Sequence, residues 1–176
     1  MAAALISLRP LEPADAAALL ELRLRNRAFL EPWEPQRDES WYTLAGQQAD
    51  IASGIEGAHA DRRFVLGIFA PALVGRIALN EIVRGVFGSA YLGYFVDEAV
   101  NGRGYATEAV REAVRFAFGE AGLHRVQAAV VPRNEASVRV LQKAGFREEG
   151  YAERYLRING VWEDHRIFAI TSEEVS

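Results

Sequence analysis

The stretch Asn101-Gly102-Arg103-Gly104-Tyr105-Ala106-Thr107-Glu108-Ala109 is the most informative part of this chain. It follows an apolar run, Tyr91 to Val96, that predicts a strand, and it opens a segment, Gly104 to Phe118, whose apolar residues recur at helical spacing. Two glycines at such a junction let a ligand come close to the backbone. The unpaired N–H groups and the dipole at a helix start attract anions, so the stretch predicts a pyrophosphate site. On these residues alone, a tight turn before an ordinary helix is the alternative.

The composition indicates a single domain spanning residues 1-176. The chain has 176 residues, a length typical of one domain, and half of them are hydrophobic, which is enough for a buried core. It has no cysteine, which excludes disulfides and a cysteine nucleophile. The net charge of -4 argues against direct nucleic-acid binding. No segment has the pattern of a signal peptide or a membrane span, so we expect a cytoplasmic protein that binds no membrane. We further expect a monomer or a homodimer.

Predicted strands and helices alternate along the chain. Strands are expected over residues 5–8, 63–69, 73–82, 91–96, 125–131, 146–157 and 162–170, with a hairpin turn at Asn159-Gly160. Helices are expected from Glu12-Pro13, after Ser40 as an N-cap, over residues 104–118 and over residues 134–144. Residues 31–39, rich in charge and proline, should form a loop. This alternation predicts an α/β (α+β) layer fold.

Three of these helices have an apolar face that should pack on the sheet. The first face consists of Ala16, Leu19, Leu20 and Leu24. The second consists of Leu44, Gln48, Ile51, Ala52 and Ile55. The third, directly after the glycine stretch, consists of Ala106, Ala109, Val110, Ala113, Val114 and Ala117.

The glycine stretch resembles motif A of the Gcn5-related N-acetyltransferases (GNAT superfamily), Gln/Arg-x-x-Gly-x-Gly/Ala. Gly104 and Ala106 match its last two fixed positions, while Asn101 stands where Gln or Arg is usual. Pro132-Arg133-Asn134-Glu135-Ala136-Ser137, followed by Lys143-Ala144-Gly145-Phe146, is similar to the family's second signature. The resemblance implies the GNAT acyl-CoA N-acyltransferase fold, a mixed central sheet splayed at the cofactor site with helices on both faces.

Other segments resemble the ribosomal-protein-alanine N-acetyltransferases of the RimJ/RimL type, and the match is closer to RimJ. It spans nearly the whole chain. The segments are Asn26 to Pro35, Arg37 to Ser40, Val83 to Gly85, Tyr91 to Tyr94, Glu149 to Ala152 and Trp162 to His165.

The family resemblance implies acetyl-CoA as co-substrate and no metal. The glycine loop would hold the phosphates of acetyl-CoA. Arg103 either adds a positive charge near these phosphates or is an ordinary solvent-exposed arginine of the loop. Backbone groups of the splayed strand would hold the pantetheine amides. The cofactor-binding residues expected on this basis are Phe95, Val96, Gly102, Arg103, Gly104, Tyr105, Ala106, Thr107 and Asn134. The three histidines show no metal-ligand spacing.

Asn134 and Ser137 match the Asn-x-x-Ser pattern of the RimJ/RimL type, in which the serine is the expected proton donor to the leaving thiolate. Many relatives use a tyrosine one helical turn later, but Leu141 stands there and has no proton to give. Ser137 is therefore the candidate acid. The alternative is purely local, since Asn134 stands where a helix begins and is a common N-cap.

The catalytic base is not defined by the resemblance. RimL-type relatives have a glutamate at the position that aligns with Leu156, which cannot act as a base. Glu34 is a candidate catalytic carboxylate. Glu81, Asp38 and Asp164 are alternatives, and each of the four is also explained as a surface carboxylate. A chain of water molecules is a further possibility.

The expected reaction is acetyl transfer from acetyl-CoA to a protein N-terminal α-amine, of alanine or serine in a ribosomal protein. Trp33 and Tyr94, together with Trp41, could line the acceptor pocket, although all three could instead be core aromatics. An α-amine titrates near ~8, so it needs less help from a base than a lysine. The alternatives are a small-molecule amine acetyltransferase and a non-catalytic acetyl-CoA sensor.

Overall fold

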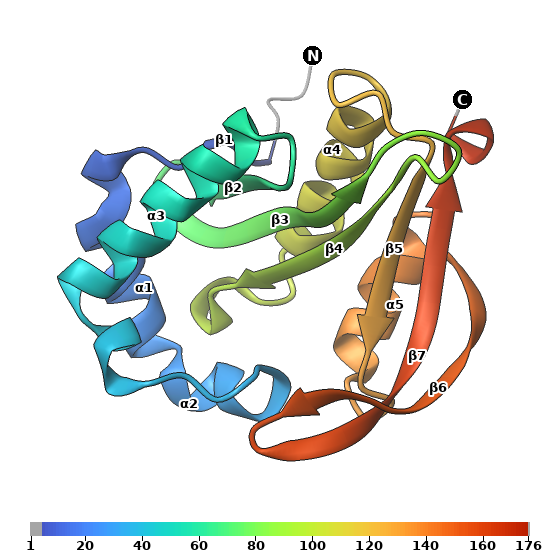
Figure 1. Ribbon diagram of the computed structural model, residues 1–176. Coiled ribbons are helices and arrows are strands. Elements are labelled where there is room, and N and C mark those ends of the chain that lie inside the picture. Colours follow the sequence, from blue (N-terminus) through green and yellow to red (C-terminus); the bar gives the residue numbers. More distant parts are fainter. Residues whose placement is uncertain (1–4, 176) are drawn as a thin grey trace.

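The computed structural model describes residues 5–175, which form one seven-stranded sheet in the order β1-β2-β3-β4-β5-β7-β6 (Figure 1). The strands are β1 Ser7–Pro10, β2 Phe64–Phe69, β3 Leu73–Val83, β4 Ser89–Val96, β5 Arg125–Val130, β6 Arg147–Ile158 and β7 Val161–Thr171. Neighbouring strands run antiparallel except β4 and β5, which run parallel. The sheet is therefore mixed, as predicted.

Helices cover both faces of this sheet. They are α1 Ala16–Arg25, α2 Arg27–Leu30, α3 Leu44–His59, α4 Tyr105–Phe118 and α5 Glu135–Lys143. Short 3-10 turns lie at Pro13–Asp15, Glu31–Trp33, Glu39–Tyr42, Glu98–Val100 and Ser172–Glu174. Helices α1 and α3 pack on one face, and α4 and α5 on the other (Figure 1). The predicted fold is confirmed.

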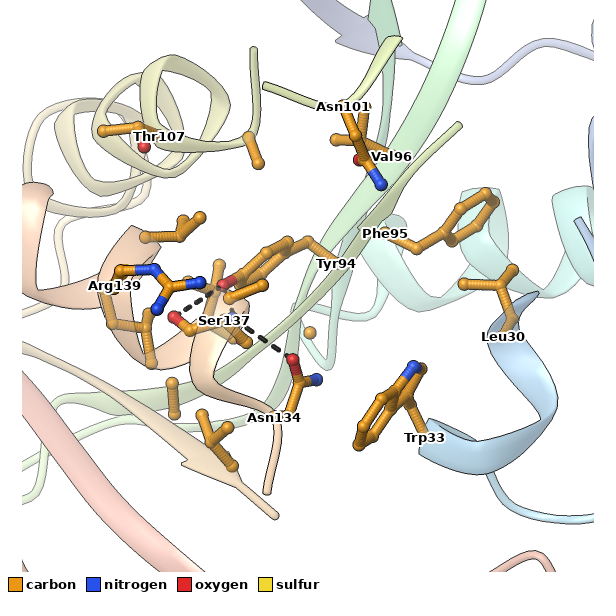
Figure 2. A pocket seen from close by; sticks show the side chains of 18 of the residues that line it. Leu30, Trp33, Tyr94, Phe95, Val96, Asn101, Thr107, Asn134, Ser137 and Arg139 are labelled. Atoms are coloured by element: carbon orange, nitrogen blue, oxygen red, sulfur yellow. Dashed lines mark hydrogen bonds between the residues drawn. The ribbon is translucent and has the colours of Figure 1, made fainter. Parts of the chain in front are cut away.

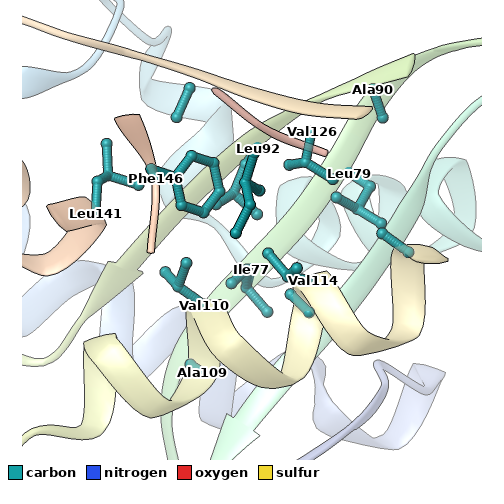
Figure 3. Packing of buried hydrophobic residues seen from close by; sticks show 14 of the residues in the cluster. Ile77, Leu79, Ala90, Leu92, Ala109, Val110, Val114, Val126, Leu141 and Phe146 are labelled. Atoms are coloured by element: carbon teal, nitrogen blue, oxygen red, sulfur yellow. The ribbon is translucent and has the colours of Figure 1, made fainter. Parts of the chain in front are cut away.

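The larger core lies between α4 and the sheet. Val110 and Val114 of α4 point at Ile77 of β3 and Leu92 of β4, and all four are buried (Figure 3). Burying an aliphatic side chain of this size contributes about 1.5–3 kcal/mol. The alanines of the predicted stripe are small, so α4 lies close to the sheet, and its N-terminus is placed next to the end of β4.

The sheet splits between β4 and β5. Their ladder includes only Ser89↔Arg125, Ala90↔Val126 and Tyr91↔Gln127. Beyond Tyr91, residues 92–96 pair only with β3, while residues 128–130 pair with β7. The facing edges of the two strands are therefore without sheet partners, and this opening is the predicted splay.

Asp97 anchors the loop that leads from β4 to α4. Its buried carboxylate accepts hydrogen bonds from Asn26 Nδ2 (3.1 Å), from the Arg25 guanidinium (2.9 Å) and from the N–H of Ala99 (3.1 Å). Burial alone would raise the pKa of Asp97, but these donors hold it below its usual value. The Asn26 Oδ1 also accepts the N–H of Glu98 (2.9 Å). The end of α1 thus fixes the start of the glycine loop.

The predicted start of α3 is wrong by three residues. Thr43 is the N-cap, and its hydroxyl oxygen accepts the N–H of Gly46 at 3.1 Å. Ser40 lies in the preceding 3-10 turn, where its carbonyl accepts the Thr43 hydroxyl at 2.6 Å. A Cβ on Gly46 would lie 2.1 Å from that carbonyl oxygen, so the tight turn requires glycine there.

The buried face of α3 also differs from the prediction. Ile51 is buried, but Leu44, Gln48 and Ala52 are exposed. The helix instead turns its glycines to the sheet: a Cβ on Gly54 would lie 3.2 Å from Val65. Because glycine has no side chain, α3 can lie close to the sheet at these positions. The spacing of apolar residues therefore did not predict the buried face of α3.

The apolar face predicted for α1 is also partly wrong. Leu19 and Leu22 are buried, but Leu24 is 50% exposed. A charged residue, Arg23, takes the buried position next to Leu22 and is only 4% exposed. Burial of an arginine requires a partner, and its partner lies in the candidate site.

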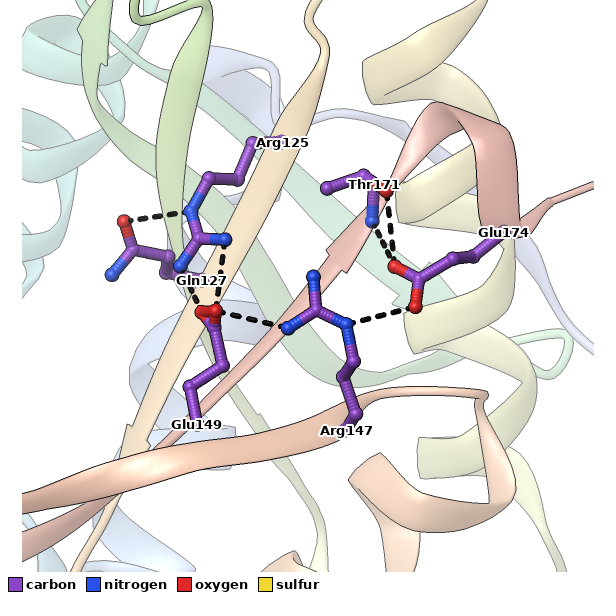
Figure 4. Close-up of polar contacts among 6 residues, drawn as sticks. All are labelled: Arg125, Gln127, Arg147, Glu149, Thr171 and Glu174. Atoms are coloured by element: carbon purple, nitrogen blue, oxygen red, sulfur yellow. Dashed lines mark hydrogen bonds and ion pairs between the residues drawn. The ribbon is translucent and has the colours of Figure 1, made fainter.

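A polar network joins the start of β5, the start of β6 and the end of β7, which lie together at one end of the sheet (Figure 4). Glu149 of β6 accepts hydrogen bonds from Arg125 of β5 (3.1 Å to Nη1) and from Arg147 (3.0 Å), and Arg147 also binds Glu174 (2.9 Å). The Arg125 guanidinium, followed by that of Arg147, lowers the pKa of Glu149 to about 2, although partial burial opposes this.

Glu149→Gln is expected to destabilise the protein by about 1–2 kcal/mol at pH 7, since charge-assisted hydrogen bonds are lost at a partly exposed site. The folded-state pKa is depressed, so the stabilisation exists above the unfolded value of 4.5 and disappears as the pH falls toward about 2. Urea unfolding at several pH values measures it. Glu153→Gln, at an exposed position of the same strand, is the control and should change little. A Glu149→Gln effect that persists unchanged at pH 2 would contradict this assignment.

Candidate active site

A cavity of about 690 Å³ opens where β4 and β5 separate. Its walls come from residues 92–96 of β4, residues 128–131 at the end of β5, the loop and start of α4, helix α5 and the segment from α1 to residue 37, together with Arg76 of β3 and His165 of β7. Figure 2 shows Tyr94, Ser137 and Arg139 on one side of it, with Leu30 and Trp33 on the other.

The cavity connects the two faces of the sheet. Successive side chains of a strand point to opposite faces. Tyr94 packs with the core under α4 and α5, whereas Phe95 packs with the core under α1 and α3. Both residues line the cavity. Two molecules entering from opposite faces could therefore meet at the splay, one on the α4/α5 side and one on the α1/α2 side.

The glycine loop forms the wall on the α4 side. Gly102 and Gly104 have φ of +79° and +81°, a conformation that L side chains rarely adopt. A Cβ on either would meet no protein atom within 4 Å, so both positions face open space. The first helical bond of α4 joins the N–H of Glu108 to the carbonyl of Gly104 (3.0 Å), which leaves the N–H groups before Glu108 without helical partners. This geometry suits an anion.

Most of the predicted cofactor residues line the cavity. These are Phe95, Val96, Gly102, Gly104, Tyr105, Ala106, Thr107 and Asn134. Arg103 is exposed and is not among the residues that line it. The binding roles of all of them remain predictions.

Ser137 and Tyr94 are joined by a hydrogen bond of 2.8 Å between their hydroxyls, in which either can donate (Figure 2). Asn134 caps α5, because its Oδ1 accepts the N–H of Ser137 at 3.2 Å. Burial raises the pKa of Tyr94 to about 12, although the hydrogen bond with Ser137 opposes the shift. Leu141 is fully buried one turn further on. The pairing of Tyr94 with Ser137 was not predicted, since no sequence pattern links β4 to α5.

Glu34 is held by Arg23 on the α1 side. Arg23 Nη1 donates to both carboxylate oxygens of Glu34, at 3.0 and 3.3 Å. The same guanidinium lies 4.2 Å over the ring of Phe95. Of the four carboxylates considered as bases, Glu34 alone is among the cavity-lining residues. Its partner was not predicted, because Arg23 lies on a helix face otherwise occupied by leucines.

Arg76 of β3 adds a second guanidinium to the α1 side. It forms an ion pair with Asp50 of α3 at 3.2 Å. Burial lowers the pKa of Arg76 to about 10, so the side chain stays charged near neutral pH. Arg37 also lines the cavity. This wall is therefore richer in cations than in anions.

The β6–β7 hairpin contacts the segment that contains Trp33 and Glu34, beside the cavity. Arg133, in the loop after β5, lies 5.2 Å over the Trp33 ring and also binds Glu163 of β7. At the hairpin tip, the N–H of Asn159 donates to the carbonyl of Glu34 at 2.9 Å. The hairpin thus holds the Trp33 segment in place. Trp41 lies outside the residues that line the cavity.

Residues 5–175 contain neither a membrane-spanning helix nor a cluster of metal ligands. No helix there is long and apolar enough to cross a membrane. No group of three or more His, Asp or Glu side chains in this part of the chain could hold a metal ion.

Sequence comparisons agree with this architecture. Residues 6–147 match the model of the acetyltransferase (GNAT) domain. The probable N-acetyltransferase YjcK of Bacillus subtilis is 45% identical over 172 residues, 96% of this chain and 95% of that protein. The [ribosomal protein uS5]-alanine N-acetyltransferase of Escherichia coli is 37% identical over 163 residues, 91% of this chain and 84% of that protein.

A solved structure is similar over nearly the whole chain. Mycobacterium smegmatis RimJ in complex with CoA-disulfide has a TM-score of 0.93 and 35% identity, covering 97% of this chain and 83% of that one. The splayed sheet and glycine loop define an acyltransferase of the GNAT type. The chain belongs to the GNAT acetyltransferase family and is an N-acetyltransferase, with RimJ/RimL ribosomal-protein-alanine N-acetyltransferases among its relatives.

Proposed function

We propose that this N-acetyltransferase transfers the acetyl group of acetyl-CoA to the α-amine of a protein N-terminus, alanine or serine of a ribosomal protein in the cytoplasm. The observation that carries the proposal is one cavity through the splay, which is lined by the glycine loop on the α4 side and by Trp33 on the α1 side. Two relatives support it: the uS5-alanine acetyltransferase and the RimJ structure that holds a CoA-disulfide.

The residues of the α4 side fit acetyl-CoA. The backbone from Gly102 to Thr107 would bind the pyrophosphate, because it presents unpaired N–H groups at a helix start. The free edge of β4 at Phe95 and Val96 would pair with the pantetheine amides, as a strand edge does with any extended amide chain. The bound thioester supplies an activated acetyl group.

Ser137 and Tyr94 would serve the departing thiolate. The Ser137 hydroxyl gives its proton to the sulfur and regains one from Tyr94 through their 2.8 Å hydrogen bond. With its pKa raised to about 12 by burial, the Tyr94 phenol is protonated at neutral pH. Asn134 fixes the start of α5 and with it the position of Ser137.

The α1 side would bind the acceptor. Trp33 and Tyr94 both line the cavity and would bound the space for a small first residue, and Glu34, the carboxylate among the lining residues, would attract the amine. On the same wall Arg23 is paired with Glu34 and Arg76 with Asp50, so Arg37, which forms no ion pair within residues 5–175, is the cation that would repel a polyamine. A peptide N-terminus has one positive charge and several carbonyls, so it fits this wall better.

The test is incubation with acetyl-CoA and a panel of acceptors, analysed by mass spectrometry. Peptides that begin with alanine or serine are expected to gain one acetyl group at the α-amine. Matched peptides with a blocked N-terminus and a free lysine should gain none. Acetylation of spermidine or an aminoglycoside without that of the peptides would assign the enzyme to small amines. Tight acetyl-CoA binding without any transfer would make the protein a sensor.

A further inference from the structure

His165 of β7 has one ring nitrogen without a partner. The residue lines the cavity and is only 2% exposed. Its Nδ1 lies 2.9 Å from the carbonyl oxygen of Glu163. A carbonyl oxygen only accepts, so Nδ1 carries a proton, and in the neutral form of the ring Nε2 then holds the lone pair. Within residues 5–175, no group forms a hydrogen bond with Nε2.

His165 lies on the acceptor side of the sheet. Phe168 of β7 packs in the core under α4 and α5. Since strand side chains alternate, His165, three residues earlier, points to the opposite face. Glu163 shares that face and binds Arg133, which covers Trp33. The imidazole therefore belongs to the side at which the acceptor amine would arrive.

The ring is also held in one orientation. Tyr155 of β6 packs against it, with ring centroids 5.6 Å apart and planes at 60°. Together with the bond from Nδ1 to Glu163, this contact leaves one edge of the imidazole, the one that includes Nε2, unengaged. A proton acceptor works best when its lone pair is positioned in advance.

No other side chain on this wall is as well suited to accept a proton. Guanidinium groups stay protonated, which excludes Arg23 and Arg76 as proton acceptors. The carboxylate of Glu34 is bound by Arg23 through both oxygens. A neutral imidazole with a free nitrogen is the standard general base near neutral pH.

We propose that His165 is the general base of the reaction, a deduction that rests on the proposed function. His165 Nε2 takes a proton from the acceptor amine as the amine nitrogen bonds to the thioester carbon. The carbon–sulfur bond breaks with its electron pair on sulfur, and Ser137 protonates the thiolate. His165 then releases its proton to water, and water returns one to the pair of Ser137 and Tyr94. One proton leaves nitrogen and one reaches sulfur, so the step balances.

The test compares variants of the whole protein in single-turnover acetylation of an alanine-initiated peptide. His165→Asn keeps an N–H donor for the Glu163 carbonyl but has no basic nitrogen, and it should lower the rate about 100-fold with unchanged acetyl-CoA affinity and melting temperature. His165→Ala should be similarly slow and should be partly rescued by added imidazole. His124→Gln is the control, because that exposed histidine lies outside the cavity lining.

The outcomes distinguish failure of the base assignment from failure of the proposed function. If the wild-type protein acetylates the peptide and His165→Asn is within threefold of it, His165 is structural and the base is elsewhere, while the proposed function stands. His165 is also structural if the His165→Ala variant is slow and is not rescued by imidazole while the His165→Asn variant reacts at nearly the wild-type rate. If the wild-type protein acetylates no peptide, the proposed function fails and the assignment of His165 fails with it.

Discussion

Gly104→Val is expected to weaken acetyl-CoA binding at least ~100-fold, because losing even two charge-assisted hydrogen bonds to phosphate exceeds the ~2.8 kcal/mol that this factor represents. Gly104 is the N-cap of α4 with φ of +81°, and a Cβ there would project into the open space that we assign to the pyrophosphate. Isothermal titration calorimetry with acetyl-CoA measures the effect.

A matched variant separates phosphate binding from backbone strain. Gly122 also has a positive φ, +63°, but lies in the turn after α4 and is not among the cavity-lining residues. Gly122→Val should therefore destabilise the fold by a similar amount and leave acetyl-CoA affinity unchanged. Unaltered affinity in a folded Gly104→Val protein would remove the glycine loop from the binding site.

Ser137→Ala is expected to lower kcat by roughly ten- to a thousandfold with little change in acetyl-CoA affinity, since general acids contribute on this scale. The hydroxyl lies at the start of α5, on the cavity wall, 2.8 Å from the Tyr94 hydroxyl. Steady-state and single-turnover kinetics with an alanine-initiated peptide would measure the change.

Tyr94→Phe provides the second half of this test. If the two hydroxyls act as one relay, Ser137→Ala and the double variant should be about equally slow, because the relay is already broken. If instead kcat is unaffected by Ser137→Ala, Ser137 is only part of the α5 start and the proton comes from another donor.

The parts of the fold that could be predicted are those set by local sequence. The alanines and valines of α4 recur at helical spacing, and Asn134 stands at a helix start, so both features follow from nearby residues alone. The glycine loop was equally predictable, since positive φ at Gly102 and Gly104 strongly favours that residue type.

The wrong predictions concern places where packing between distant segments decides the structure. Ser40 and Thr43 both have a hydroxyl suited to capping α3, and the choice depends on how Gly46 packs against the turn before it. The buried face of α3 follows from the closeness of Gly54 to Val65, a contact with β2 that periodicity does not register. Tertiary contacts outweighed local preference in both cases.

The residues of the candidate site also fall into those that local sequence predicts and those that only the packing of distant segments brings together. The residues expected on the cofactor side come from one strand and one continuous stretch after it, with Asn134 before α5 in addition, and all of them except Arg103 line the cavity. The acceptor side is assembled from Arg23, Glu34, Arg76 and His165, which come from four separate elements. Their proximity depends on the three-dimensional fold, so Arg23, Arg76 and His165 were missed.

The proposed mechanism requires that the two substrates meet through the splay from opposite faces of the sheet. A crystal structure with a bisubstrate analogue, coenzyme A joined through an acetyl linker to the α-nitrogen of an alanine-initiated peptide, would show both binding paths at once. The pyrophosphate is expected at the start of α4, with the alanine between Trp33 and His165. A peptide that leaves on the α5 side of the sheet, or a pyrophosphate away from Gly102 and Gly104, would contradict this mechanism.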